Sequence, residues 1–237
     1  MKQAKFEVNG KKYKMLYDCP DREINNQIQE IFSDKDYQSA KRKKDMVVLD
    51  VGANVGMFSL FIKNWAKKIY AVEPSKRIFT CLKENTKDWD NIEIFNVGLS
   101  NQKGNEFLYG KNDETPQTMM IEGPHREVIS ITTIEDFFKE NKIEHIDAMK
   151  IDVEGMEYAI FADDTFKQVA SKIDFIIGEG HYVNQAIPEY ILIMLKENGF
   201  KAKFLPRKNF SLTLNYENPN TGQKTQYVVK KSTMFIG

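Results

Sequence analysis

The feature that most constrains the fold is an apolar run that leads directly into a glycine turn. The segment Met46–Val51 is almost entirely apolar, as expected of a strand buried on both faces of a sheet. Gly52 and Gly56 follow it, and apolar side chains then recur at helical spacing over residues 55–66. A buried strand, a glycine turn and a helix form the first unit of a doubly wound α/β sheet, which binds ligands beyond the carboxyl ends of its strands.

Strands and helices continue to alternate along the chain after this unit. Five or six such units predict an α/β fold with a Rossmann-like, mostly parallel sheet. Turn residues interrupt the alternation over residues 98–127, with a short strand expected at Glu106–Tyr109. The predicted strands are 69–72, 92–97, 128–131, 147–151, 172–178 and 200–205, and the predicted helices are 75–89, 133–141, 155–163 and 188–198.

The first 45 residues differ in pattern and are predicted to form an appendage to a main domain at 46–237. Alternating apolar residues over 5–17, with Asn9-Gly10 between them, predict a hairpin. Helical spacing follows over 21–32, with Asp21 as the expected cap. At the other end, the main domain is expected to finish with a hairpin at 208–230 and a strand at Thr233–Ile236.

Composition narrows the classes of function. The chain has 34 basic and 34 acidic side chains, and this balance argues against nucleic acid as a partner. No apolar run approaches the roughly 18–20 residues of a membrane span, so no membrane partner is expected. No apolar segment follows Met1 as in a secretory signal, which predicts a cytoplasmic protein. Two isolated cysteines, Cys19 and Cys81, predict neither a disulfide framework nor a zinc site.

The glycine turn carries polar groups that suit a small charged ligand. Gly52 lets the chain turn sharply, and Gly56 lets the next helix begin close to the sheet and the ligand. Asp50, at the strand end, is expected to pair with a ligand ammonium group. Asn54 is expected to bind a carboxylate or an amide, and it stands where dinucleotide-binding turns have their middle glycine, which argues against NAD.

An acid at the end of the second strand completes the predicted cofactor site. Glu73 lies 17 positions after Gly56, and a carboxylate there can accept hydrogen bonds from both hydroxyls of a ribose. The expected ligand therefore has a ribose, an ammonium and a carboxylate but no diphosphate. S-adenosylmethionine has these groups, and it is the predicted cofactor.

Several segments together resemble the FkbM-type methyltransferases. The resemblance covers about Met46 to His181, and its most specific part is Met149–Glu157. It implies methyl transfer to a hydroxyl of a sugar, polyketide or other small molecule, and a sheet whose final strand is antiparallel. Among the segments that carry it, 96–100 adds Asn96 and Gly98 to the expected cofactor site. The matching segments are 49–56, 71–74, 96–100 and 149–157.

Methyl transfer to oxygen also requires that the acceptor loses a proton. His181 follows the fifth core strand, and the usual histidine pKa suits a general base at neutral pH. Glu179, two positions earlier, is expected to point the same way and, with Asp152, to orient the imidazole. The other candidates, which also have plain structural explanations as an ion pair or as helix-start charge, are Lys150, Glu154 and Glu157.

The metal requirement and the partners stay open at this point. Three acids and a histidine are compatible with a magnesium site, but their spacing is not diagnostic. The expected partner is a small hydroxylated acceptor, and a homo-oligomer is compatible with the sequence. The alternatives are an NAD-dependent oxidoreductase or epimerase, a nucleic-acid methyltransferase, and an inert binding protein that keeps the fold.

Overall fold

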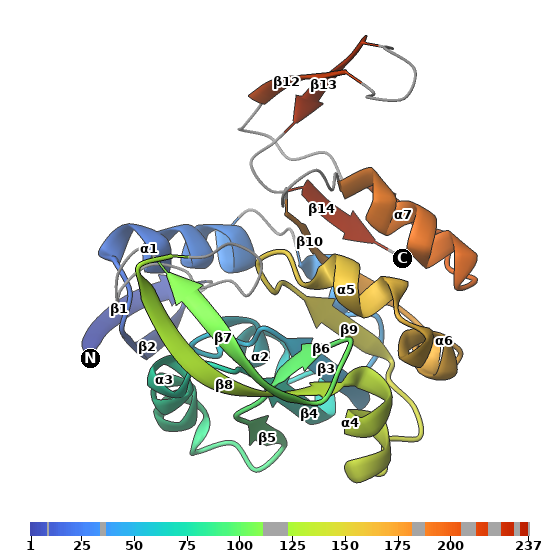
Figure 1. Ribbon diagram of the computed structural model, residues 1–237. Coiled ribbons are helices and arrows are strands. Elements are labelled where there is room, and N and C mark those ends of the chain that lie inside the picture. Colours follow the sequence, from blue (N-terminus) through green and yellow to red (C-terminus); the bar gives the residue numbers. More distant parts are fainter. Residues whose placement is uncertain are drawn as a thin grey trace.

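A computed structural model describes residues 1–8, 10–33, 37–110, 123–181, 188–204, 212–217, 224–229 and 233–236. Its centre is a seven-stranded sheet (Figure 1). Within this sheet only β14 runs antiparallel to its neighbours, β10 and β11, which confirms the antiparallel final strand. In spatial order the strands are β11 (Lys203–Phe204), β14 (Thr233–Ile236), β10 (Ile176–Gly180), β9 (Ala148–Ile151), β3 (Met46–Val51), β4 (Ala66–Val72) and β5 (Ile92–Phe95).

The sheet is buried on both faces because successive side chains of each strand point to opposite sides. In β3, Val48 joins one apolar cluster, while Leu49 and Val51 join another. Helices α2 (Met57–Ile62) and α3 (Lys76–Thr86) cover the first side. The second side is covered by α4 (Ile134–Glu140), α5 (Glu157–Ala162), α6 (Asp164–Ala170) and α7 (Pro188–Glu197).

The N-terminal segment is built into the first apolar cluster. Strands β1 (Lys2–Val8) and β2 (Lys11–Tyr17) pair as predicted, and α1 (Asp21–Ile28) continues as a π-helical turn over Gln29–Ser33. Phe32 packs edge-on against Phe61 of α2, with ring centroids 5.5 Å apart. The predicted cap was wrong: Asp21 is the first helical residue, and its carboxylate accepts a hydrogen bond from the Tyr17 hydroxyl at 3.1 Å.

The interruption after β5 is a small sheet of its own. Strands β6 (Gly98–Ser100) and β7 (Gly104–Gly110) flank β8 (His125–Thr133), parallel and antiparallel to it respectively. The two predicted strands in this region lie inside β7 and β8 but were too short. This sheet lies beside α3 and reaches the start of that helix (Figure 1).

Other element boundaries also moved. The predicted strand 172–178 begins only at Ile176, because Ile173 makes a single isolated bridge to Ile146. The predicted helix 55–66 is shorter, since Ala66 already belongs to β4. Near the C-terminus, β12 (Leu212–Glu217) pairs with β13 (Lys224–Val229) as a hairpin, while its predicted turn lies outside the described residues, as does Asn9 in the first hairpin.

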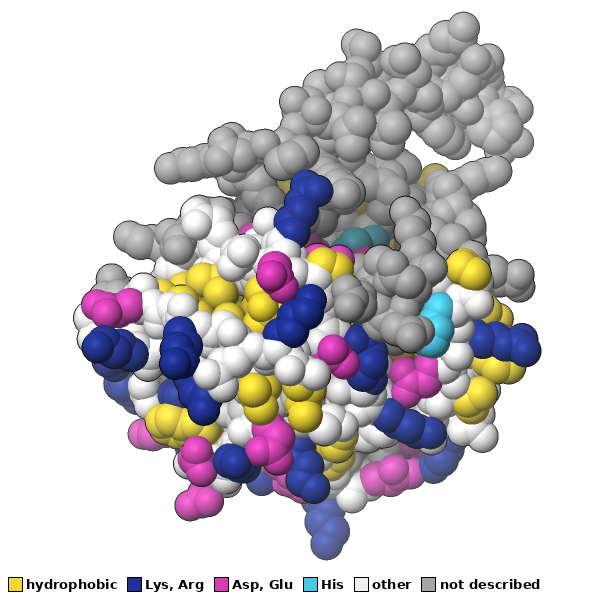
Figure 2. Space-filling model, turned by 90° about the vertical axis from the view of Figure 1, so that its left-hand side faces the viewer, with side chains coloured by type: hydrophobic (Ala, Val, Ile, Leu, Met, Phe, Trp, Pro, Cys, Tyr) yellow, Lys and Arg dark blue, Asp and Glu magenta, His cyan; other side chains and the backbone are white. Residues whose placement is uncertain are grey.

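In the part of the chain that the structure describes, no helix is both long and apolar enough to cross a membrane. The face seen in Figure 2 carries basic and acidic side chains interspersed, as the zero net charge of the chain would suggest. The polar groups of interest instead gather at the carboxyl ends of the parallel strands.

Candidate active site

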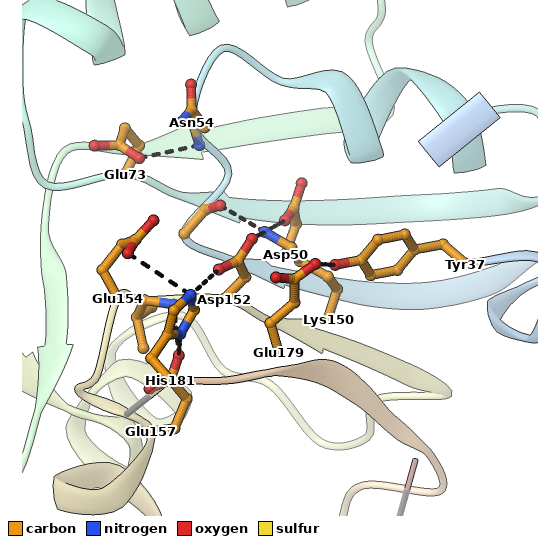
Figure 3. A network of polar contacts seen from close by, with 12 residues as sticks. Tyr37, Asp50, Asn54, Glu73, Lys150, Asp152, Glu154, Glu157, Glu179 and His181 are labelled. Atoms are coloured by element: carbon orange, nitrogen blue, oxygen red, sulfur yellow. Dashed lines mark hydrogen bonds and ion pairs between the residues drawn. The ribbon is translucent and has the colours of Figure 1, made fainter. Parts of the chain in front are cut away.

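The predicted site residues meet at the carboxyl ends of the parallel strands (Figure 3). Asp50 lies near the end of β3, Glu73 directly follows β4, Asp152 directly follows β9, and His181 directly follows β10. These four strands run parallel, so their carboxyl ends face the same side. The fold therefore brings together residues that are up to 131 positions apart in the sequence.

The glycine turn leaves β3 in a conformation that only glycine adopts easily. Gly52 has a φ of +74°, and its N–H donates to the Val72 carbonyl at 3.0 Å. A Cβ atom at Gly52 would lie 1.9 Å from the backbone oxygen of Asp152. The reason for glycine therefore includes close packing of the turn against the end of β9, and not only the approach of a ligand.

Gly56 and Asn54 complete this turn. Gly56, with a φ of +90°, precedes α2, and a Cβ there would lie 2.9 Å from the Leu82 side chain of α3. Asn54 also has positive φ, at 51°, and its side-chain oxygen accepts from the Val55 N–H at 2.7 Å. Asn54 thus shapes the turn locally, and its proposed contact with a ligand stays a prediction.

Glu73 is held by backbone amides on both of its carboxylate oxygens. Oε2 accepts from the Asn54 N–H at 3.0 Å, and Oε1 accepts from the Ser75 N–H at 2.9 Å. Burial raises the pKa of Glu73 to about 7, although these hydrogen bonds and Lys150 favour its ionised form. Each oxygen keeps a second lone pair, so the carboxylate remains able to accept two ribose hydroxyls.

Neighbouring residues fix the loop that carries Glu73. The Asn96 side chain donates to the carbonyls of Glu73 and Pro74, at 2.9 Å each. Gly98 packs closely under the same loop, because a Cβ there would lie 3.4 Å from Pro74. Both residues, expected at the cofactor site, support Glu73 from behind in this structure.

Glu127 of β8 was missed by the sequence analysis. Its carboxylate accepts from the Ser75 hydroxyl at 2.9 Å and from the Lys76 N–H at 2.8 Å, so it caps the start of α3 beside Glu73. Glu127 lies in the region where the strand–helix rhythm is interrupted, 52 positions after Ser75. No local pattern in the sequence indicated this contact.

Under the turn lies a buried ion pair. Lys150 Nζ lies 3.6 Å from Asp50 Oδ1 and 3.7 Å from Asp152 Oδ2, and it donates to the Gly52 carbonyl at 2.7 Å. Asp50 is fully buried and also accepts from the Ser59 hydroxyl at 2.6 Å. Burial alone would lower the pKa of Lys150, but Asp152 and Asp50 outweigh it and raise that pKa.

This pair changes the interpretation of two predicted residues. Asp50 neutralises Lys150, so binding a ligand ammonium as well would require one carboxylate to serve two cations. Lys150 joins the strand end to the Gly52 turn, which makes it a support of the turn rather than a proton acceptor.

His181 lies between carboxylates on both edges of its ring (Figure 3). On one edge, Nδ1 is 2.9 Å from Glu157 Oε1. On the other, Nε2 is 3.6 Å from Glu154 Oε2 and 3.7 Å from Asp152 Oδ1. Burial pushes the pKa of His181 down, but these carboxylates, Glu157 first, outweigh it and raise the pKa well above the usual histidine value. This raised pKa differs from the expectation for an unperturbed histidine.

The partners of His181 match the predicted ones only in part. Asp152, which was expected alongside Glu179 as an orienting residue, lies 3.7 Å from Nε2, but the residue bonded to Nδ1 is Glu157, from the first turn of α5. Glu179 instead contacts the hydroxyl of Tyr37 at 3.5 Å, which brings the N-terminal segment into the site. Half-buried Glu154 has its pKa raised to about 7, mainly because it is partly withdrawn from water, while His181 opposes this shift.

A second group of ionisable side chains lies at the opposite end of the sheet. His145 Nε2 is 3.1 Å from Asp174, and Lys43 Nζ is 2.5 Å from Asp147. Asp147 also accepts from the Val47 N–H at 2.7 Å, where β3 begins. This group ties the amino ends of the strands together, and the half-exposed His145 lies at the surface.

The order of strands, the glycine turn and the strand-end acid together define a fold of S-adenosylmethionine-dependent methyltransferases. The chain matches the solved structure of the SAM-dependent methyltransferase from Agrobacterium tumefaciens with a TM-score of 0.52, at 10% identity, over 100% of this chain and 70% of that one. Residues 50–202 match the model of the methyltransferase FkbM domain. The chain belongs to the methyltransferase FkbM domain family.

Curated relatives match shorter stretches. Methyltransferase 1 of Beauveria bassiana is 25% identical over 154 residues, which cover 54% of this chain and 62% of the relative. The AMB antimetabolite synthetase AmbE of Pseudomonas aeruginosa is 40% identical over 87 residues, which cover 34% of this chain and 4% of the relative. The chain thus spans less than two thirds of either relative.

The hydrogen-bond acceptors beside the turn fit the cofactor that the family implies. Glu73 presents carboxylate lone pairs beside the turn at the end of β3, as a ribose requires. The fixed positive charge of a sulfonium would also meet a site that is rich in carboxylates.

Proposed function

We propose that the protein transfers a methyl group from S-adenosylmethionine to a hydroxyl oxygen of a small molecule such as a sugar, with His181 as the general base. The observation that carries the proposal is the placement of His181, whose Nε2 edge turns toward the carboxyl ends of the strands while Nδ1 is bound to Glu157. When bound, the cofactor supplies a methyl group whose bond to sulfur breaks with the electron pair going to sulfur.

The chain's own groups would handle the proton. Neutral His181 can accept the hydroxyl proton at Nε2 as the acceptor oxygen bonds to the methyl carbon. The imidazolium that results is stabilised by Glu157 at 2.9 Å and by two carboxylates within 3.7 Å of Nε2. Because the pKa of His181 is raised, turnover should increase as the pH rises through that pKa and the base becomes available.

We also propose that this step needs no divalent cation. Ligand atoms of Asp152, Glu157 and His181 lie within 4.8 Å of one another, so these three residues could hold a metal ion. However, Glu157 is already bound to His181 Nδ1, and an ion that used both groups would have to break this hydrogen bond. Turnover should therefore be the same in EDTA and in magnesium, and a requirement for magnesium would refute this part of the proposal.

The test replaces His181 by asparagine, whose amide can keep a donor near Glu157 but cannot act as a base. Acceptors are first found by screening sugars and small hydroxylated metabolites for formation of S-adenosylhomocysteine. We then expect His181→Asn to turn over about 10²–10⁴-fold more slowly, with unchanged affinity for S-adenosylhomocysteine by calorimetry. The matched control is His145→Asn, at the opposite end of the sheet. A wild-type rate in His181→Asn would refute the proposed role.

A further inference from the structure

The first turn of α5 holds His181 at two points. The carboxylate of Glu157 is bound to its ring at Nδ1, and the hydroxyl of Tyr158 donates to its backbone carbonyl at 2.6 Å. We propose that Glu157 is a positioning residue, which fixes the proton of His181 on Nδ1 and so leaves Nε2 as the atom that meets the acceptor. The inference rests on the proposed role of His181 as the base.

The direction of the Glu157–His181 hydrogen bond follows from a third partner. Glu157 Oε1 also accepts from the Val153 N–H at 3.0 Å, so this oxygen acts as an acceptor. The Nδ1 atom facing the same oxygen at 2.9 Å must then be the donor. When His181 is neutral, its single ring proton is therefore on Nδ1, and Nε2 carries the free lone pair.

The other edge of the ring is not committed to a short hydrogen bond with the facing carboxylates. Nε2 lies 3.6 Å from Glu154 and 3.7 Å from Asp152, both longer than a normal hydrogen bond. Among the described residues, Glu157, Glu154 and Asp152 are the charged groups that raise the pKa of His181, while Lys150 lies 3.7 Å from Asp152. The ring is thus oriented from the Nδ1 side, and the Nε2 side stays able to exchange a proton.

A purely structural role explains Glu157 poorly. Its side chain is fully buried, and within the described part of the chain its Oε2 meets no hydrogen-bond partner. Burying a carboxylate with one unsatisfied oxygen is costly, and an apolar side chain would fill the same space without that cost. A charge at this place is explained by the residue that it contacts, which is His181.

The test uses the fact that the chain has only three histidines. Their ring signals can be titrated separately by NMR, with His125 and His145 as internal references. In Glu157→Gln we expect the pKa of His181 to fall by about 1–3 units, the effect of removing a nearby opposite charge, while the two references do not move. The matched control is Glu140→Gln on α4, which removes an exposed carboxylate paired with Lys103 and should leave His181 unchanged.

A second readout separates the two proposals. The rise of turnover with pH should move to lower pH in Glu157→Gln by the same amount as the pKa of His181. A shifted pKa with an unmoved rate profile would keep the positioning role and refute His181 as the base. An unshifted pKa would overturn the positioning role itself.

The wild-type protein gives a third measurement, in case Glu157→Gln does not fold. Nitrogen chemical shifts of His181 report which ring nitrogen carries the proton once the pH exceeds its pKa. We expect the Nδ1–H form. Finding the Nε2–H form would overturn the inference without any variant.

Discussion

The two ends of the proposed active site are built in different ways. At the cofactor end, Glu73 is held by the backbone N–H groups of Asn54 and Ser75. At the acceptor end, His181 is held between the side chains of Glu157, Glu154 and Asp152. Backbone amides are uncharged, whereas the groups that hold the ring of His181 are carboxylates. The cofactor end is therefore a fixed receptor in the sense that the groups holding Glu73 keep their charge at every pH, whereas the groups holding His181 are themselves ionisable.

The two ends also differ in where their residues come from. The core of the cofactor end lies within residues 50–75, a single strand–turn–helix–strand unit. The acceptor end combines residues 150–158 with 179–181, and Tyr37 reaches it from the N-terminal segment. The acceptor end therefore depends on contacts between segments far apart in the sequence, whereas the core of the cofactor end lies within one segment.

The largest expected effect tests how rigid the cofactor end is. Gly52→Ala would place a Cβ 1.9 Å from the backbone oxygen of Asp152, on a residue with a φ of +74°. Overpacking costs about 1–3 kcal/mol and the left-handed conformation about 1–2. We therefore expect the free energy of unfolding to fall by roughly 2–5 kcal/mol in denaturant titrations, with loss of cofactor binding.

Gly10→Ala is the matched control for this variant. Gly10 has nearly the same φ, +75°, but a Cβ there would meet no atom within 4 Å. It should lose only the conformational part, about 1–2 kcal/mol. Equal losses in the two variants would mean that the contact between the turn and Asp152 contributes nothing.

The same contrast explains which parts of the fold the sequence could predict. Strands β3 and β4 and the turn between β3 and α2 depend on apolar runs and glycine spacing, and these are local signals. The small sheet β6–β8–β7 has no such signal, because its strands are interrupted by turn residues and pair across 15 positions or more. Boundaries such as the start of β10 depend on ladder hydrogen bonds that a hydrophobic pattern does not report.

The site shows this division as well. Glu73 could be placed from its position at a strand end, but Glu127, which caps the neighbouring helix, could not. His181 was found as a rare residue type after a strand. Its true partner Glu157 was harder to recognise, because an acid in the first turn of a helix has an ordinary explanation in the helix dipole.

The next effect in size tests the fixed receptor directly. Glu73→Gln removes the ionised acceptor and turns an amide N–H₂ group toward a backbone N–H. Hydrogen bonds to a charged group contribute about 1.5–3 kcal/mol, so affinity for S-adenosylhomocysteine should fall about 10- to 150-fold by calorimetry. Glu93→Gln, which removes an exposed carboxylate of β5, is the control and should bind normally.

Glu73 also gives this end its one expected dependence on pH. The pKa of Glu73 is raised to about 7 in the folded protein, so ionisation of this carboxyl group opposes folding. Its contribution to the free energy of unfolding is therefore complete below the unfolded pKa of the residue. That contribution is lost as the pH rises through about 7. Cofactor binding has the opposite sign, because ribose hydroxyls donate to the ionised carboxylate. Affinity should fall by up to about tenfold per pH unit below 7, and Glu73→Gln should abolish this slope. If the affinity of the variant keeps this slope, another ionisable group causes it.

The smallest expected effect tests whether the N-terminal segment belongs to the acceptor end. Tyr37 is buried, packs against Phe58 with ring centroids 5.4 Å apart, and places its hydroxyl 3.5 Å from Glu179.

Tyr37→Phe keeps the ring and removes only the hydroxyl, so the free energy of unfolding should fall by no more than about 1 kcal/mol. Affinity for S-adenosylhomocysteine should stay the same, because the hydroxyl that is removed contacts Glu179 at the acceptor end, whereas kcat/KM for the acceptor should fall a few-fold. Tyr13→Phe, in a ring stack of the N-terminal hairpin with Phe6, is the control for losing a tyrosine hydroxyl in the same segment and should leave both values unchanged. If Tyr37→Phe weakens cofactor binding instead, Tyr37 supports the sheet as a whole, and the two ends of the site are less independent than their contacts indicate.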